Sequence, residues 1–63
     1  MKEFDSVRLL DDYNGIQAGT IGVIVHEYDG TAFEVEFFDK DGNTIDVVTT
    51  PSDLVTLEIE YKG

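Results

Sequence analysis

Apolar and polar residues alternate along most of this chain in short segments, each rich in β-branched and aromatic side chains. This alternation is typical of strands that bury one face and expose the other. Five segments show it, separated by glycines and short polar stretches: residues 6–10, 20–28, 32–38, 44–50 and 55–61. Because no segment keeps a convincing helical period, the pattern predicts an all-β chain with an antiparallel sheet.

The connections between these segments predict how the strands are joined. Residues 11–19 make a long first loop, and Asp29-Gly30 is a dipeptide that favours a tight hairpin turn. Residues 39–43 make the next hairpin loop. The proline that opens residues 51–54 cannot continue a central strand, so this stretch suits a single 3₁₀ turn. We therefore expect one domain over the whole chain, folded as a small, partly closed barrel of five strands.

This layout resembles the Src-homology-3-like (SH3-like) barrel over nearly the whole chain. Residues 9–13, Leu-Leu-Asp-Asp-Tyr, stand where such domains carry Ala-Leu-Tyr-Asp-Tyr, and residues 51–55, Pro-Ser-Asp-Leu-Val, stand where they carry Pro-Ser-Asn-Tyr-Val. The resemblance implies the barrel shape and a 3₁₀ turn before the last strand. It does not extend to polyproline binding, because Asp11 and Leu54 replace two aromatic residues of the groove and only Tyr13 remains.

The chain also resembles a family of short bacterial proteins known as domain of unknown function 4926. The similar stretches are Asp-Ser-Val-Arg-Leu-Leu, Gly-Thr-Ile-Gly-Val-Ile-Val, Phe-Glu-Val-Glu-Phe and Asp-Lys-Asp-Gly-Asn-Thr, at residues 5–10, 19–25, 33–37 and 39–44. The resemblance implies no enzyme activity. Because genes of this family often neighbour genes for small toxin-like proteins, the resemblance also implies an antitoxin or immunity role as an expectation. Small-barrel subunits of redox and photosynthetic complexes share part of the pattern, so a subunit role stays open.

The charge of the chain narrows the choice of partner. Fourteen residues are Asp or Glu and four are Lys or Arg, for a net charge of −10. Nucleic acids and anionic membranes are disfavoured, because the basic residues are few and scattered: Lys2, Arg8, Lys40 and Lys62. A basic protein partner is the natural electrostatic match. The alternative is that the charge only keeps a small protein soluble.

The same composition limits the chemistry and the location of the protein. There is no Cys, and His26 is the only histidine, so neither a disulfide nor a His-based zinc site is expected within one chain. Residues 1–5 lack the apolar core of a signal peptide, and no apolar run reaches the roughly 20 residues of a membrane span. We expect a cytoplasmic protein without a cofactor.

Three carboxylates form the strongest candidate for a partner-binding site. If residues 39–43 are a five-residue loop, the predicted register places Glu36 opposite Asp46, with Glu34 one step along the same face. Like charges directly opposite each other destabilise a sheet, so their presence suggests a basic partner. The aromatic residues Tyr13 and Phe38 would border this face. The alternative interpretation is an ordinary solvated face.

Other candidate sites have structural explanations. Residues 39–43 resemble a calcium loop, but Thr44 and Thr50 stand where an EF-hand requires Gly and Glu. Their Asp and Asn residues are expected to serve the turn instead. Gly19 and Gly22 indicate either a bulge or barrel bend, or close approach of a ligand to the backbone. His26 has no predicted acid–base partner, so we expect no catalytic residue and no metal site.

These observations leave three hypotheses for function. The preferred one is a non-catalytic interaction module that binds a basic protein, in the manner of an antitoxin or immunity protein. The second is a nucleic-acid mimic that occupies the binding site of a basic protein, which requires regularly spaced surface carboxylates. The third is a structural subunit of a larger complex. The sequence identifies neither the partner nor the oligomeric state.

Overall fold

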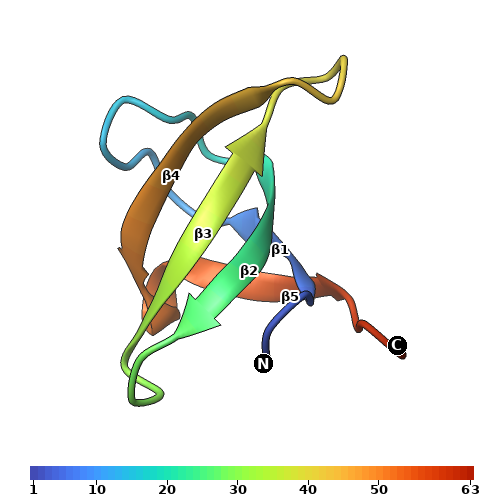
Figure 1. The fold of residues 1–63 in the computed structure, drawn as a ribbon. Helices are drawn as coiled ribbons and strands as arrows, with labels where there is room; N and C mark the ends of the chain where they lie inside the picture. Colours follow the sequence, from blue (N-terminus) through green and yellow to red (C-terminus); the bar gives the residue numbers. More distant parts are fainter.

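The computed structural model describes all 63 residues, which form five strands and one 3₁₀ turn (Figure 1). All strand pairs are antiparallel, and the spatial order is β4-β3-β2-β1-β5. The elements are β1 (Ser6–Leu9), β2 (Ile21–Glu27), β3 (Ala32–Phe38), β4 (Thr44–Pro51), η1 (Ser52–Leu54) and β5 (Val55–Ile59). The prediction of an all-β chain with five strands and a 3₁₀ turn before the last one is therefore confirmed.

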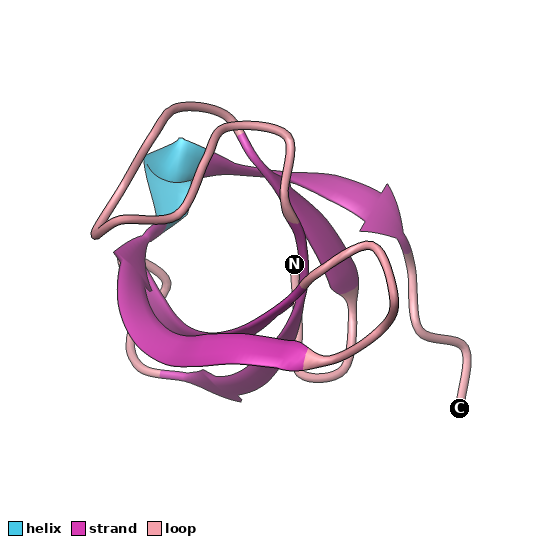
Figure 2. Cartoon of the chain, turned by 90° about the horizontal axis from the view of Figure 1, so that it is seen from above, coloured by secondary structure: helices cyan, strands magenta, loops and turns pink.

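The single sheet curls on itself into a ring, which Figure 2 shows from above. Its two outer strands, β4 and β5, are not hydrogen-bonded to each other, so the barrel is only partly closed. The η1 turn connects them along the chain and is held by two hydrogen bonds: the Ser52 N–H donates to the Thr31 carbonyl before β3 at 2.9 Å, and the Leu10 N–H after β1 donates to the Leu54 carbonyl at 2.8 Å. Two strand edges therefore remain open along most of their length.

The core lies inside the ring and is small. Its nine buried apolar residues come from all five strands and from the first loop: Val7, Leu9, Ile16, Ile24, Phe33, Val35, Phe37, Val48 and Val55. The strict alternation in β3 predicts its buried residues correctly, because only one of its faces is apolar. In β2 both faces carry apolar residues, and the inward positions prove to be Gly22 and Ile24.

Gly22 is required by the packing of β2 on β3. A Cβ atom at this position would lie 2.6 Å from Cγ1 of Val35 and 2.9 Å from Cδ1 of Phe37. Those distances are too short for real carbon contacts, so no larger residue fits without movement of β3. The close approach to this glycine is therefore made by core side chains. Gly19 has a different role, since its φ of +91° marks a turn before β2.

The hairpin loops agree with their predicted turn chemistry. Residues 39–43 form a loop closed by a hydrogen bond from the Asp39 N–H to the Asn43 carbonyl, and Gly42 has a φ of +84°. The Asp39 carboxylate accepts hydrogen bonds from the N–H groups of Asp41 and Asn43. The turn between β2 and β3 has Gly30 at a φ of +88°. Both turns use glycine where the backbone enters the left-handed region.

Candidate functional site

The outward-facing side chains of β2, β3 and β4 form a continuous surface, which we call the β3 face. Residues 33, 35 and 37 point into the core, so Glu34, Glu36 and Phe38 point outward. The strand register gives each of them neighbours on both sides. The β3 face consists of Ile21, Val23, His26, Glu34, Glu36, Phe38, Thr44, Val47 and Thr49. We include Ile45, which has no partner in the register, because it lines one cleft with Ile21 and Phe38.

The predicted register of β3 and β4 is wrong by one residue. The loop length is as expected, because Phe38 pairs with Thr44, but Phe37 then pairs with Asp46. Ile45 is an extra residue that forms a β-bulge immediately after the hairpin, and a bulge shifts every later pair by one position. Glu36 therefore lies opposite Val47 and not opposite Asp46.

This shift changes the character of the predicted carboxylate cluster. Asp46 and Val47 are adjacent in a strand and point to opposite faces, so Asp46 leaves the face that carries Glu36. It is exposed, and its carboxylate accepts a hydrogen bond from the N–H of Val47 at 2.8 Å. The expected repulsion between two facing carboxylates does not arise. Glu34 and Glu36 remain together on the β3 face.

Each of these two glutamates is held by a threonine of β4. The Thr44 hydroxyl donates to Oε2 of Glu36, and the Thr49 hydroxyl donates to Oε1 of Glu34, both at 2.6 Å. Glu36 is half-buried between Val23 on β2 and Val47 on β4. The carboxylates are thus fixed in position on a largely apolar surface.

No Lys or Arg of the chain lies within ion-pair distance of these glutamates. The ion pairs of the molecule involve Lys2, Arg8 and His26, and their acidic partners are Glu3, Asp5, Glu58 and Glu60. His26 pairs with Glu34 in the sheet, but its ring is turned to Glu3, with 3.6 Å between Nδ1 and Oε2. Glu34 and Glu36 therefore present negative charge that no basic side chain neutralises.

The β3 face also exposes large apolar side chains. Ile45 is 48% exposed, Val47 46% and Ile21 39%. Ile21, Phe38 and Ile45 line an open cleft between the end of the first loop, residues 17–20, and the β3–β4 hairpin. Such side chains in a small protein indicate a surface that another molecule can cover.

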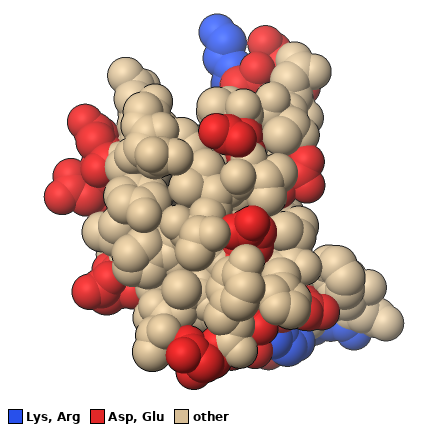
Figure 3. Space-filling view, turned by 60° about the vertical axis from the view of Figure 1, so that its left-hand side comes forward, with Lys and Arg blue, Asp and Glu red and all other residues tan.

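Figure 3 turns the β4 side of the molecule forward and shows how the acids are distributed. The Asp and Glu side chains form several separate groups on this face, with uncharged residues between the groups. The exposed side chains of Ile45 and Val47 contribute apolar area to the β3 face, which also carries Glu34 and Glu36, so this surface is mixed. Protein interfaces commonly combine an apolar centre with surrounding polar groups.

Of the five predicted partner-binding residues, Glu34, Glu36 and Phe38 share this face, whereas Tyr13 does not. Tyr13 pairs with Ile16 across a tight turn of the first loop and packs against the core. Its hydroxyl donates to the Thr49 carbonyl at 3.2 Å, so it ties the loop to β4.

Comparison with known families supports the resemblance seen in the sequence. The model of the family described as domain of unknown function (DUF4926) matches residues 3–57. The chain belongs to this family. No curated protein and no solved structure matches the chain significantly.

The DUF4926 chain has no group of three or more His, Asp or Glu residues placed to hold a metal ion. None of its helical segments has the length and apolar character needed to cross a membrane.

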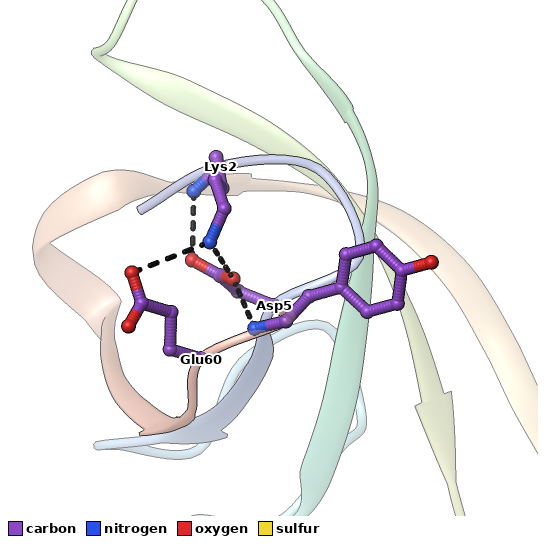
Figure 4. Close-up of polar contacts among 4 residues, drawn as sticks. Lys2, Asp5 and Glu60 are labelled. Carbon is purple, nitrogen blue, oxygen red and sulfur yellow. Dashed lines mark hydrogen bonds and ion pairs between the residues drawn. The ribbon is translucent and has the colours of Figure 1, made fainter. Parts of the chain in front are cut away.

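A buried carboxylate organises the two terminal segments of this DUF4926 chain (Figure 4). Asp5 is only 2% exposed, and its carboxylate accepts hydrogen bonds from the Tyr61 N–H at 2.7 Å and from both nitrogens of Lys2 at 2.9 Å. Nζ of Lys2 also lies 3.5 Å from Glu60. These bonds, the Tyr61 N–H above all, lower the pKa of Asp5 from 3.8 to about 2. The sequence carried no distinct signal for this role.

The basic residues of the chain are concentrated at one side of the fold. Lys2, Arg8 and Lys62 all lie in residues 1–9 and 55–63, which include β1 and β5, together with four acids: Glu3, Asp5, Glu58 and Glu60. That part of the chain has a net charge of −1. The rest holds ten acids and Lys40 and has a net charge of −9. The β3 face therefore belongs to the strongly negative part of the molecule.

Proposed function

We propose that this protein is a non-catalytic interaction module that binds a basic protein surface through the β3 face. The observation that carries the proposal is the pair Glu34 and Glu36, fixed by threonines on an exposed apolar surface and left without a cation. A partner with Lys or Arg side chains above these two carboxylates, and apolar side chains against Ile45 and Val47, would complement the face.

Both the apolar side chains and the carboxylates of the β3 face contribute to such a contact. Burial of the exposed apolar side chains supplies a non-directional gain of roughly 25 cal/mol for each Å² removed from water. The carboxylates supply orientation and specificity, because each requires a cation once water is excluded. The net charge of −9 on this part of the molecule accelerates the approach of a basic protein at low ionic strength.

The distribution of the acids favours this proposal over a nucleic-acid mimic. A mimic requires a regular row of carboxylates that copies the spacing of phosphates. In this fold the acids come from four of the five strands and from every loop, and several serve the backbone of turns. Asp12 accepts from the Ala18 N–H, Asp29 from the Thr31 N–H and Asp39 from the Asn43 N–H. Those carboxylates have a structural role of their own.

An antitoxin or immunity role is the form of this function that the family resemblance suggests. The first partners to test are therefore the basic proteins encoded beside the gene. Each is co-expressed with the protein, and the dissociation constant of any complex is measured by calorimetry at about 0.1 M and about 1 M salt. We expect binding that weakens as salt screens the charges.

A matched pair of double variants tests the surface. Glu34→Gln with Glu36→Gln removes two charges but keeps an oxygen for each threonine hydroxyl. Glu27→Gln with Asp53→Asn removes two exposed charges elsewhere. We expect the first variant to weaken binding at least about tenfold, since charges at the centre of an interface are desolvated, and the second about threefold or less. Absence of a basic neighbour that binds at low salt, or equal effects of both variants, would contradict the proposal.

A further inference from the structure

A second apolar surface lies at the opposite edge of the sheet, along β5. Leu57 is 47% exposed, Ile59 66%, and beyond the strand Tyr61 is 49% exposed. The ring of Tyr61 packs edge-on against Phe4, itself 53% exposed, with 5.4 Å between the ring centres. The bulge at Glu58 pairs Leu57 with the buried Val7 and Ile59 with Ser6, so Leu57 and Ile59 point to opposite faces of the sheet. We call Phe4, Ile59 and Tyr61 the β5 strip. The alternation in residues 55–61 predicts that Val55, Leu57, Ile59 and Tyr61 share one buried face, but only Val55 is buried.

The backbone edge of β5 is also accessible. β5 is the last strand of the sheet and pairs only with β1. A bulge between Ser6 and Val7 shifts its pairing, and Figure 2 shows the tip of β5 leaving the ring. Its outer N–H and C=O groups therefore face no other strand of the sheet. An unpaired edge beside apolar side chains is a template for another strand.

Charge does not protect this edge, although charge commonly protects the open edges of sheets. Glu58 pairs with Arg8, with 3.4 Å between Oε1 and Nε, and Glu60 pairs with Lys2 at 3.5 Å. The net charge of this side of the molecule is −1, against −9 for the rest. The β5 strip thus lies on the side of the molecule that carries the smaller net charge.

We infer that the β5 strip is the contact surface of a symmetric dimer, with a second copy of this chain as its occupant. A two-fold axis beside β5 brings each strip against the other and sets the two edges antiparallel, so both copies use the same residues. The nearly neutral side of each copy faces inward, and the two strongly negative parts lie outward. A second copy meets less electrostatic repulsion at this side of the molecule than at the strongly negative part, so it fits here.

This arrangement makes a prediction about salt that is opposite to the one for the basic partner. Two copies repel each other over distance through their outer parts, and salt shortens the range of that repulsion from about 10 Å at 0.1 M to about 3 Å at 1 M. Dimerisation therefore strengthens as salt rises, whereas binding of a basic protein weakens. The two proposals fail independently of each other.

Sedimentation equilibrium of the whole chain tests the inference, at concentrations up to about 1 mM and at about 0.1 M and 1 M salt. We expect a reversible monomer–dimer equilibrium that shifts toward dimer at high salt. Ile59→Lys should weaken it at least about 100-fold, because the dimer loses two buried apolar side chains. Amide hydrogen exchange in β5 should slow as the wild-type protein is concentrated.

Val47→Lys is the matched control, since it makes the same change of charge at an exposed apolar residue of the β3 face. We expect it not to weaken the dimer, since the added positive charge lowers the repulsion between the two negative parts, and melting curves establish that both variants are folded. The inference is overturned if the wild type remains monomeric at the highest salt and concentration. It is also overturned if Ile59→Lys still forms dimers, or if Val47→Lys dissociates them to the same extent.

Discussion

Replacement of Gly22 by Ala probes the contact that sets the spacing of β2 and β3. The new methyl group would meet Cγ1 of Val35 at 2.6 Å, Cδ1 of Phe37 at 2.9 Å and the carbonyl oxygen of Glu36 at 3.0 Å. The oxygen belongs to the backbone and Val35 is fully buried, so the clash is relieved only by movement of the strands. Overpacking of this kind costs roughly 1–3 kcal/mol.

That cost is large for a domain of this size. A free energy of unfolding of roughly 0.05–0.15 kcal/mol per residue gives about 3–9 kcal/mol for the whole chain. In small domains each kcal/mol lowers Tm by about 4–8 °C, so Gly22→Ala should lower Tm by about 4–24 °C. Thermal and urea unfolding, followed by circular dichroism, measure the change.

A double variant identifies the cause of this loss. Val35→Ala removes the atom nearest to the new methyl group, so the two substitutions together should destabilise less than the sum of each alone. The difference should be about 0.5–3 kcal/mol, as expected for residues in direct contact. A Gly22→Ala protein that melts within about 2 °C of the wild type would refute the reasoning, as would strict additivity with Val35→Ala.

Two further predictions concern side-chain hydrogen bonds that hold the barrel together. Because the folded-state pKa of Asp5 is about 2, below its ordinary value of 3.8, its charged form stabilises the fold above about pH 4, and this contribution is lost as the pH falls toward 2. Asp5→Asn should therefore melt below the wild type at pH 6, and the gap should narrow between pH 4 and pH 2; a constant gap would contradict the assignment. Tyr13→Phe removes the hydrogen bond to the Thr49 carbonyl and should cost about 0.5–1.5 kcal/mol in urea unfolding, with faster amide exchange in the first loop.

The parts of the fold that depend on local pattern were predictable. Strict alternation in β3 identified its buried residues, and the glycines at 30 and 42 identified two turns, because each signal lies within a few neighbouring residues. The 3₁₀ turn after Pro51 was predictable for the same reason. In β2 the alternation was uninformative, since both faces are apolar and only the packing on β3 decides which one is buried.

The candidate site was only partly predictable. Glu34, Glu36 and Phe38 were placed on one face correctly, because they belong to one strand and follow its period. Asp46 was assigned to that face through a register between two strands, and the bulge at Ile45 changed this register. A bulge of a single residue leaves no distinct mark in a short strand of β-branched and polar residues. Pairing between strands is therefore the step at which the prediction failed.

The sequence by itself determined the fold class, the order of the elements, the turn residues and the excess of acidic side chains, since each depends on local backbone preference or on composition. Only the tertiary structure decided how the charge is distributed. Pairing of β1 with β5 brings Arg8 to Glu58, and the folding of the terminal segment brings Lys2 to Glu60, so one edge becomes nearly neutral. Glu34 and Glu36 keep their charge because curling of the sheet places no basic residue beside them. Which carboxylates are neutralised is set by contacts between residues far apart in the chain.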